Sequence, residues 1–97
     1  MTENWLFDQA PNVAAITTRQ VLEEALPILH VDHYSDDHSW AFTCSTTDRA
    51  EDGRVIFLEE ALGIDPSLAE VADLPPGWEA TRDYIGGQWN RHESSDI

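Results

Sequence analysis

The sequence predicts a single α+β domain, and three observations lead to that prediction. Two adjacent runs, 28–34 and 39–45, alternate apolar and polar residues with a period of two, as half-buried β-strands do. Segments 54–62 and 65–73 place apolar residues at helical spacing. Residues 78–82 alternate again like a strand. The length of 97 residues suits one domain, because single domains cluster near about 100 to 150 residues.

The start of the chain, residues 1–12, carries one apolar trio, Trp5-Leu6-Phe7, among polar residues. We expect a flexible N-terminal arm here. The trio could dock on the core of its own chain or on another subunit, and the sequence leaves both possibilities open.

The next segment gives a divided signal. Residues 13–18 are typical of an extended strand, whereas residues 20–26 are mostly good helix formers. Pro27 ends whichever element precedes it, because it pushes Leu26 out of the helical region.

The two alternating runs are separated by turn residues at 35–38 and predict a β-hairpin. The predicted register places three pairs on the core face: His33 with Trp40, Val31 with Phe42, and Leu29 with Cys44. Five residues should point to the other face: His30, Asp32, Tyr34, Ala41 and Thr43.

Two short helices should follow. The first spans 54–62 and stops at Gly63, and the second spans 66–73 with Asp65 as its N-cap. The globular domain is expected to cover residues 13–91, and the polar residues 92–97 are expected to form a disordered tail.

The charge balance restricts the classes of partner. The formal net charge is −14, with five arginines, no lysine and no basic cluster, which excludes nucleic acid and anionic membrane as partners. The acidity has three interpretations that the sequence leaves open: general solubility, adaptation to high salt, or complementarity to a basic protein partner. One cysteine, no apolar leader and no long apolar run predict a cytoplasmic protein. The oligomeric state does not follow from the sequence.

No residue pattern predicts catalysis, a cofactor or a metal. His30, His33 and His38 lie near carboxylates, but His30 and His33 leave opposite faces of a strand and do not share an ion. Cys44 faces the predicted core in a negative field, which disfavours a reactive thiolate.

The candidate interaction surface consists of acidic residues near the hairpin turn and the following loop, together with aromatic and arginine residues near the C-terminus. These residues are Asp32, Asp36, Asp37, His38, Asp48, Glu51, Asp52, Trp78, Arg82 and Trp89.

Three segments resemble the immunity protein 33-like family of small bacterial domains: ITTRQVL at 16–22, SWAF at 39–42 and DLPPGW at 73–78. The family is thought to neutralise toxins and has no established catalytic residues. The resemblance implies that residues 13–22 form a strand. It also implies a mostly antiparallel sheet built from that strand, the hairpin and the strand at Trp78, with both helices on one face.

Three hypotheses for function follow. The first is a non-catalytic protein-binding domain, in an immunity or regulatory role, that meets a basic partner. The second is a small metal-binding or enzymatic domain that uses the region of His30, His33 and His38. The third is a structural homo-oligomer in which the apolar trio of the N-terminal arm docks on a neighbouring subunit.

Overall fold

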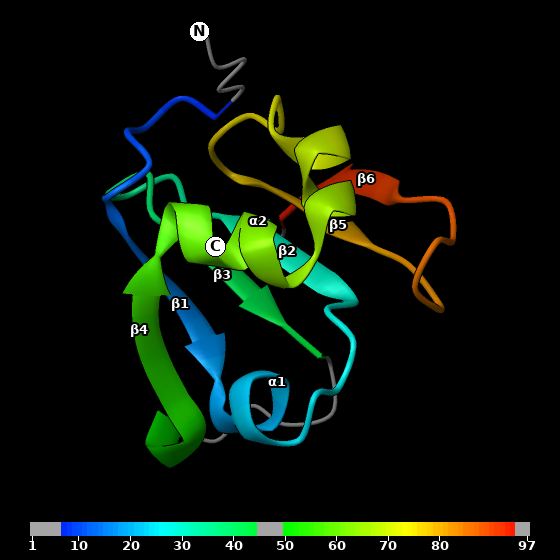
Figure 1. Cartoon of the computed structure of the whole chain (residues 1–97). Helices are drawn as coiled ribbons and strands as arrows, with labels where there is room; N and C mark the ends of the chain where they lie inside the picture. The colour runs from blue at the N-terminus through cyan, green and yellow to red at the C-terminus, as the bar shows by residue number, and fades with distance from the viewer. Residues whose placement is uncertain (1–6, 45–49, 95–97) are drawn as a thin grey trace, which may run out of the picture.

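The computed structural model describes residues 7–44 and 50–94. The described chain forms a sheet of six strands with helices packed on one face (Figure 1). In chain order the elements are β1 (Ala14–Thr18), α1 (Arg19–Glu23), β2 (His30–His33), β3 (Trp40–Thr43), the 3₁₀ helix η1 (Ala50–Asp52), β4 (Gly53–Phe57), α2 (Leu58–Ile64), the 3₁₀ helix η2 (Pro66–Val71), β5 (Trp78–Thr81) and β6 (Asn90–Glu93). The α+β class is confirmed.

The strand order is β4-β1-β3-β2-β5-β6, so β4 and β6 form the two edges of the sheet (Figure 1). Neighbouring strands are antiparallel except β1 and β3, which run parallel. In the central hairpin, His33 pairs with Trp40 and Val31 with Phe42, as the alternation predicts. β5 pairs with β2 on the side away from β3. The sheet is therefore mostly antiparallel, and the parallel pair of β1 and β3 makes it mixed.

The segment after Val13, whose sequence favours a strand in its first part and a helix in its second, contains one element of each kind. The chain is a strand through Thr18 and then a single turn of helix through Glu23. Both predictions for the segment are therefore correct over part of it, whereas the strand over 13–22 that the resemblance implies is wrong beyond Thr18. The chain turns after α1 at Ala25, whose φ of 57° lies in the left-handed region that few non-glycine residues occupy.

The core lies between the sheet and the layer formed by α2 and η2. The hairpin contributes Val31, Trp40 and Phe42, all buried, and the helical layer contributes residues such as Leu58 and Leu68. We call the opposite surface of the sheet the open face. Because side chains alternate along a strand, His30 and Asp32 lie on the open face, while Val31 and His33 face the core.

A buried ion pair ties η2 to the sheet. Arg82 follows β5 and donates hydrogen bonds to the carbonyl oxygen of Ile28 and to the Asp65 carboxylate. Asp65 is the N-cap of η2, as predicted, and accepts from the backbone N–H of Ser67 at 3.0 Å. The guanidinium also lies 4.1 Å from the centre of the Trp89 ring. Arg82 and Trp89 are thus parts of the core.

The prediction of a helix over 54–62 is wrong in its first half, because Gly53–Phe57 is strand β4. Ile56 faces the core while Val55 and Phe57 are exposed on the open face, so apolar residues on both faces hide the alternation. The helix begins at Leu58. Its first turn is capped by the Glu60 carboxylate, which accepts from the Phe57 backbone N–H at 2.7 Å. The second predicted helix, 66–73, is the 3₁₀ helix η2 and is shorter, ending at Val71.

Both ends of the described chain are more ordered than predicted. His92 and Glu93, assigned to a disordered tail, belong to β6 and pair with Glu79 and Trp78 of β5. In the expected flexible arm, the Phe7 ring is buried and packs edge-on against Trp40, with ring centres 4.9 Å apart. Phe7 therefore docks on the core of its own chain. The other two residues of the apolar trio lie outside the described residues.

Candidate functional site

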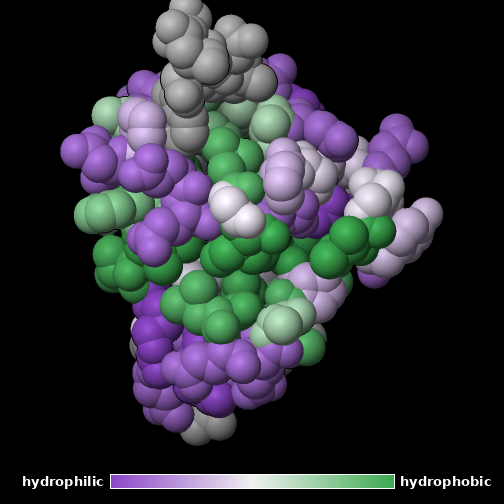
Figure 2. Space-filling view, viewed as in Figure 1, coloured by the Kyte–Doolittle hydropathy of each residue, from purple (hydrophilic) through white to green (hydrophobic). Residues whose placement is uncertain are grey.

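An apolar groove lies on the helical side of the molecule, between α1, the end of α2 and the turn that joins β5 to β6. Figure 2 shows this surface as a hydrophobic band between hydrophilic regions. The groove has a volume of about 210 Å³. It is lined by Val21, Leu22, Ala25, Leu26, Pro27, Ile28, Ile64, Asp65 and Ile85. Large apolar side chains that line a concave surface are typical of a binding site.

Three of the lining side chains are substantially exposed although they are large and apolar. Leu22 of α1 is 42% exposed, Ile64 of α2 is 44% exposed, and Ile85 is 60% exposed. These residues come from three separate segments, so the apolar surface exists only in the folded chain. Full burial of an exposed side chain of this size contributes about 1.5–3 kcal/mol, and a partner that covers the exposed part of each of these would gain roughly half of that.

The floor of the groove is held in place by the buried ion pair described above. Arg82 donates to the Ile28 carbonyl from Nε at 3.1 Å and from Nη2 at 2.9 Å, and its Nη2 also donates to Asp65. Ile28 and Asp65 both line the groove. Burial opposes ionisation of Asp65, but the hydrogen bonds from Ser67 and Arg82 outweigh it and hold the pKa of the carboxyl below its usual range.

Carboxylates flank this apolar surface. Glu23 and Glu24 directly follow Leu22, and Asp83 stands two residues before Ile85; all three are exposed. Glu24 accepts a hydrogen bond from Arg19 at 3.0 Å. Carboxylates that neighbour groove residues in the chain would suit an apolar side chain that has basic neighbours.

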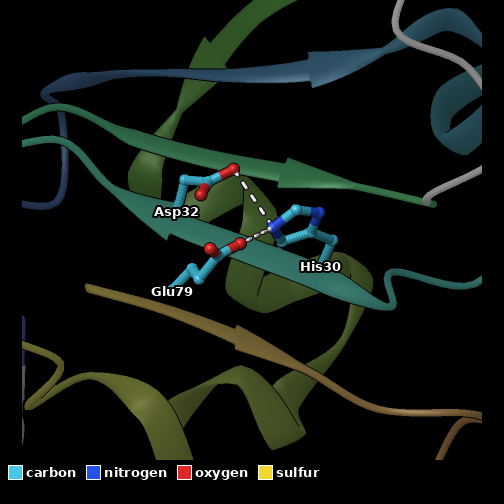
Figure 3. A group of neighbouring side chains, drawn as sticks. All are labelled: His30, Asp32 and Glu79. Carbon is cyan, nitrogen blue, oxygen red and sulfur yellow. Dashed lines mark hydrogen bonds and ion pairs between the residues drawn. The ribbon is translucent and has the colours of Figure 1, made fainter. Parts of the chain in front are cut away.

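A second group of polar side chains lies on the open face. Asp32 of β2 stands opposite Glu79 of β5, which stands opposite His92 of β6. The ring of His30 lies between the Asp32 and Glu79 carboxylates (Figure 3). Its Nε2 atom is 2.6 Å from Glu79 Oε1 and 3.4 Å from Asp32 Oδ2, and His92 Nε2 is 3.3 Å from Glu79 Oε2. We call these four residues the histidine–carboxylate cluster.

The two carboxylates determine the protonation state of His30. Hydrogen bonding with Asp32, supported by Glu79 and opposed by partial burial, raises the pKa of His30 to about 9. The ring is therefore a cation at neutral pH. A protonated imidazole between two carboxylates is not available as a general base.

The predicted interaction residues do not gather in one place. Asp36, Asp37 and His38 are exposed at the β2–β3 turn, where Asp37 accepts from the Ser39 hydroxyl at 2.7 Å and the Ser39 hydrogen bonds lower the pKa of Asp37. Asp32 is on the open face. Asp48 lies outside the described residues.

The remaining predicted residues are mostly structural. Glu51 is exposed, but Asp52 is buried and accepts from Gln20 Nε2 at 3.1 Å and from Arg19. Trp78 is half-buried beside the core, and Arg82 and Trp89 are buried.

The three histidines of the second hypothesis do not converge on one point. His33 is buried on the core face, where its ring stacks on Trp40 with centres 3.9 Å apart and Nδ1 lies 2.7 Å from the Leu74 carbonyl oxygen. His30 is on the other face, as the odd spacing predicts. Sequence reasoning missed Glu79 and His92, because their proximity to β2 depends on strand pairings that no local pattern indicates.

The groove was also missed, although each of its apolar residues is visible in the sequence. The signal that could have found them is the group of large apolar residues at element ends: Leu22 in the last turn of α1, Ile64 at the end of α2 and Ile85 in a turn. Comparisons of the chain with protein-family models, with curated protein sequences and with solved structures find no match.

Proposed function

We propose that this chain is a non-catalytic protein-binding domain that receives an apolar side chain of a basic partner protein in the groove. The single observation that carries the proposal is the concave surface formed by Leu22, Ile64 and Ile85, all exposed, above a floor held by buried hydrogen bonds. A surface that is already shaped and rigid loses little conformational entropy when it binds.

The charge of the chain supports a basic partner. The net charge is −14. The described arginines are all engaged with carboxylates, namely Arg19 with Glu24 and Asp52, Arg54 with Glu23, Arg82 with Asp65, and Arg91 with Asp73. Such a surface repels a second copy of the same chain and accelerates association with a basic one.

Two observations support a role without catalysis. Cys44, the only cysteine of the chain, is buried in the core and is not accessible to a substrate. The raised pKa of His30 removes the most prominent base of the open face at neutral pH. The resemblance to immunity proteins suggests what the partner is. We propose a toxin domain or another basic protein that this chain inhibits or regulates.

The test is affinity capture from an extract of the source organism with three tagged forms of the full chain: wild type, Ile85→Asp and Val55→Asp. Both substitutions replace an exposed apolar residue by the same charged one, but only Ile85 lines the groove, whereas Val55 lies on the open face. We expect a basic protein, identified by mass spectrometry, to bind wild type and Val55→Asp. Ile85→Asp should bind it at least about tenfold more weakly.

Ionic strength provides the second measurement on the same complex. Association with the basic partner should slow as salt rises from about 0.05 M to about 0.5 M, because exposed charges are screened. A partner that Ile85→Asp retains as well as wild type does contradicts the proposed groove. A partner with an acidic surface, or one whose association rate is independent of salt, contradicts the proposed electrostatic complementarity.

A further inference from the structure

We propose that four side chains of the open face bind a divalent transition-metal ion, with Zn²⁺ the best match: His30, Asp32, Glu79 and His92. The groove and this cluster lie on different surfaces of the molecule, so the inference goes beyond the proposed function and does not depend on it.

Strand register brings the four side chains together. Asp32, Glu79 and His92 are directly paired residues of β2, β5 and β6, and they form one row across the sheet. His30 precedes Asp32 by two residues, so it projects from the same face beside that row. Three adjacent strands therefore hold the donors on one rigid surface, which a single strand does not achieve with His30 and His33.

Two of the distances between donor atoms are close to those around a tetrahedral ion. Donors about 2.1 Å from a tetrahedral zinc lie about 3.4 Å from one another. His30 Nε2 is 3.4 Å from Asp32 Oδ2, and His92 Nε2 is 3.3 Å from Glu79 Oε2. A third contact, His30 Nε2 to Glu79 Oε1, is 2.6 Å and has to open by less than an ångström, within reach of a side-chain rotation. Within the described part of the chain, Nε2 of His30 and one oxygen each of Asp32 and Glu79 lie within 4.8 Å of one another. His92 is outside this group of three, so its ring has to turn toward the ion to become the fourth ligand.

Ligand chemistry selects the class of ion. Two imidazoles and two carboxylates are donors that suit Zn²⁺ and neighbouring transition metals. Ca²⁺ takes six to eight oxygen ligands, and Mg²⁺ keeps most of its water, so neither matches a site with two histidines. Two carboxylates also neutralise the charge of a divalent ion. The side chains of His30, Asp32 and Glu79 are between 20% and 29% exposed, which leaves a path for the ion.

The alternative is a cross-strand ion cluster in which His30, carrying a proton, stabilises the sheet without a metal. The metal site and the ion cluster differ in how they take up metal. A metal site saturates at one equivalent and loses affinity when any donor is removed, whereas an ion cluster takes up metal only weakly, as exposed carboxylates do elsewhere on the chain.

The experiment titrates the full chain with ZnCl₂ at pH 7.5 by isothermal calorimetry and follows the histidine ring resonances by NMR. We expect one equivalent of zinc to bind, to displace the proton of His30 into the buffer, and to shift the rings of His30 and His92 together. His92→Ala should weaken binding about tenfold, and Glu79→Gln should weaken it more, because Glu79 contacts both histidines.

His38→Ala is the matched control for His92→Ala, since His38 is also exposed but lies at the β2–β3 turn outside the cluster. It should leave zinc affinity unchanged. His92 lies on an exposed edge strand, so His92→Ala is expected to fold, which circular dichroism checks. Absence of saturable binding, or equal affinity of wild type and Glu79→Gln, would show an ion cluster only and overturn the proposal. Equal losses in His38→Ala and His92→Ala would overturn it as well.

Discussion

The arginines of this chain differ in how much they contribute to its stability, because some are buried and others are exposed. Arg82 is fully buried and contacts the Ile28 carbonyl, Ser67 and Asp65. Arg91 also pairs with a carboxylate, Asp73, but both side chains are exposed to water. Burial, more than the presence of a partner, decides how much each pair matters for stability.

Replacing each arginine by methionine tests that distinction. Arg82→Met leaves the Asp65 carboxylate without its counter-ion and the Ile28 carbonyl without its donors, and it should lower the free energy of unfolding by about 3–5 kcal/mol. Arg91→Met removes an exposed pair and should lower it by less than about 1 kcal/mol. Urea denaturation measures both values. Similar losses in the two variants would contradict the structural role assigned to Arg82.

Asp65 gives the buried pair a pH dependence with a definite sign. Its pKa is lower in the folded chain than the ordinary value of 3.8, so its ionised form stabilises the fold above about pH 4. That contribution is lost as the pH falls through the lowered pKa.

The corresponding measurement is the difference in unfolding free energy between wild type and Asp65→Asn as a function of pH. The difference should be constant above about pH 5 and should shrink below about pH 4. Asp73→Asn, an exposed carboxylate in an ion pair, is the control and should show only a small difference throughout. A wild-type advantage over Asp65→Asn that stays constant down to pH 2 is incompatible with the described hydrogen bonds.

A strand of this protein could be predicted from the sequence only where one of its faces is apolar and the other is polar. The hairpin of β2 and β3 was predictable with its register, because both runs alternate and a short turn joins them. β4 was not, because Val55, Ile56 and Phe57 are apolar on both faces and the spacing to Leu58 and Leu62 mimics a helix. β6 was not, because all four of its residues are exposed and it is held by pairing with β5.

The same limit applies to the two sites. Alternation along β2 correctly placed His30 and Asp32 on the open face. It could not place Glu79 opposite Asp32, because that pairing joins strands 47 residues apart in the chain. The groove forms where three separate segments, which carry Leu22, Ile64 and Ile85, come together in the fold. No local sequence pattern predicts that these segments are neighbours. Long-range pairing therefore determines both sites.

The surface of the whole molecule is strongly acidic but also exposes large apolar side chains. The carboxylates give a net charge of −14. Large apolar side chains are also exposed, in the groove and on the open face at Ile16, Val55 and Phe57. In the part of the chain that the structure describes, no helix is long and apolar enough to cross a membrane. We propose that a basic partner binds the groove and does not bind the apolar residues of the open face.

Methyl groups on the two apolar surfaces allow this assignment to be measured directly. Leu22, Ile64 and Ile85 report on the groove, and Ile16 and Val55 report on the open face. The decisive measurement is methyl NMR of the labelled full chain titrated with the captured basic partner. The expected result is that the methyl signals of Leu22, Ile64 and Ile85 shift and broaden while those of Ile16 and Val55 keep their positions. Perturbation confined to Ile16 and Val55 would contradict it and place the partner on the sheet.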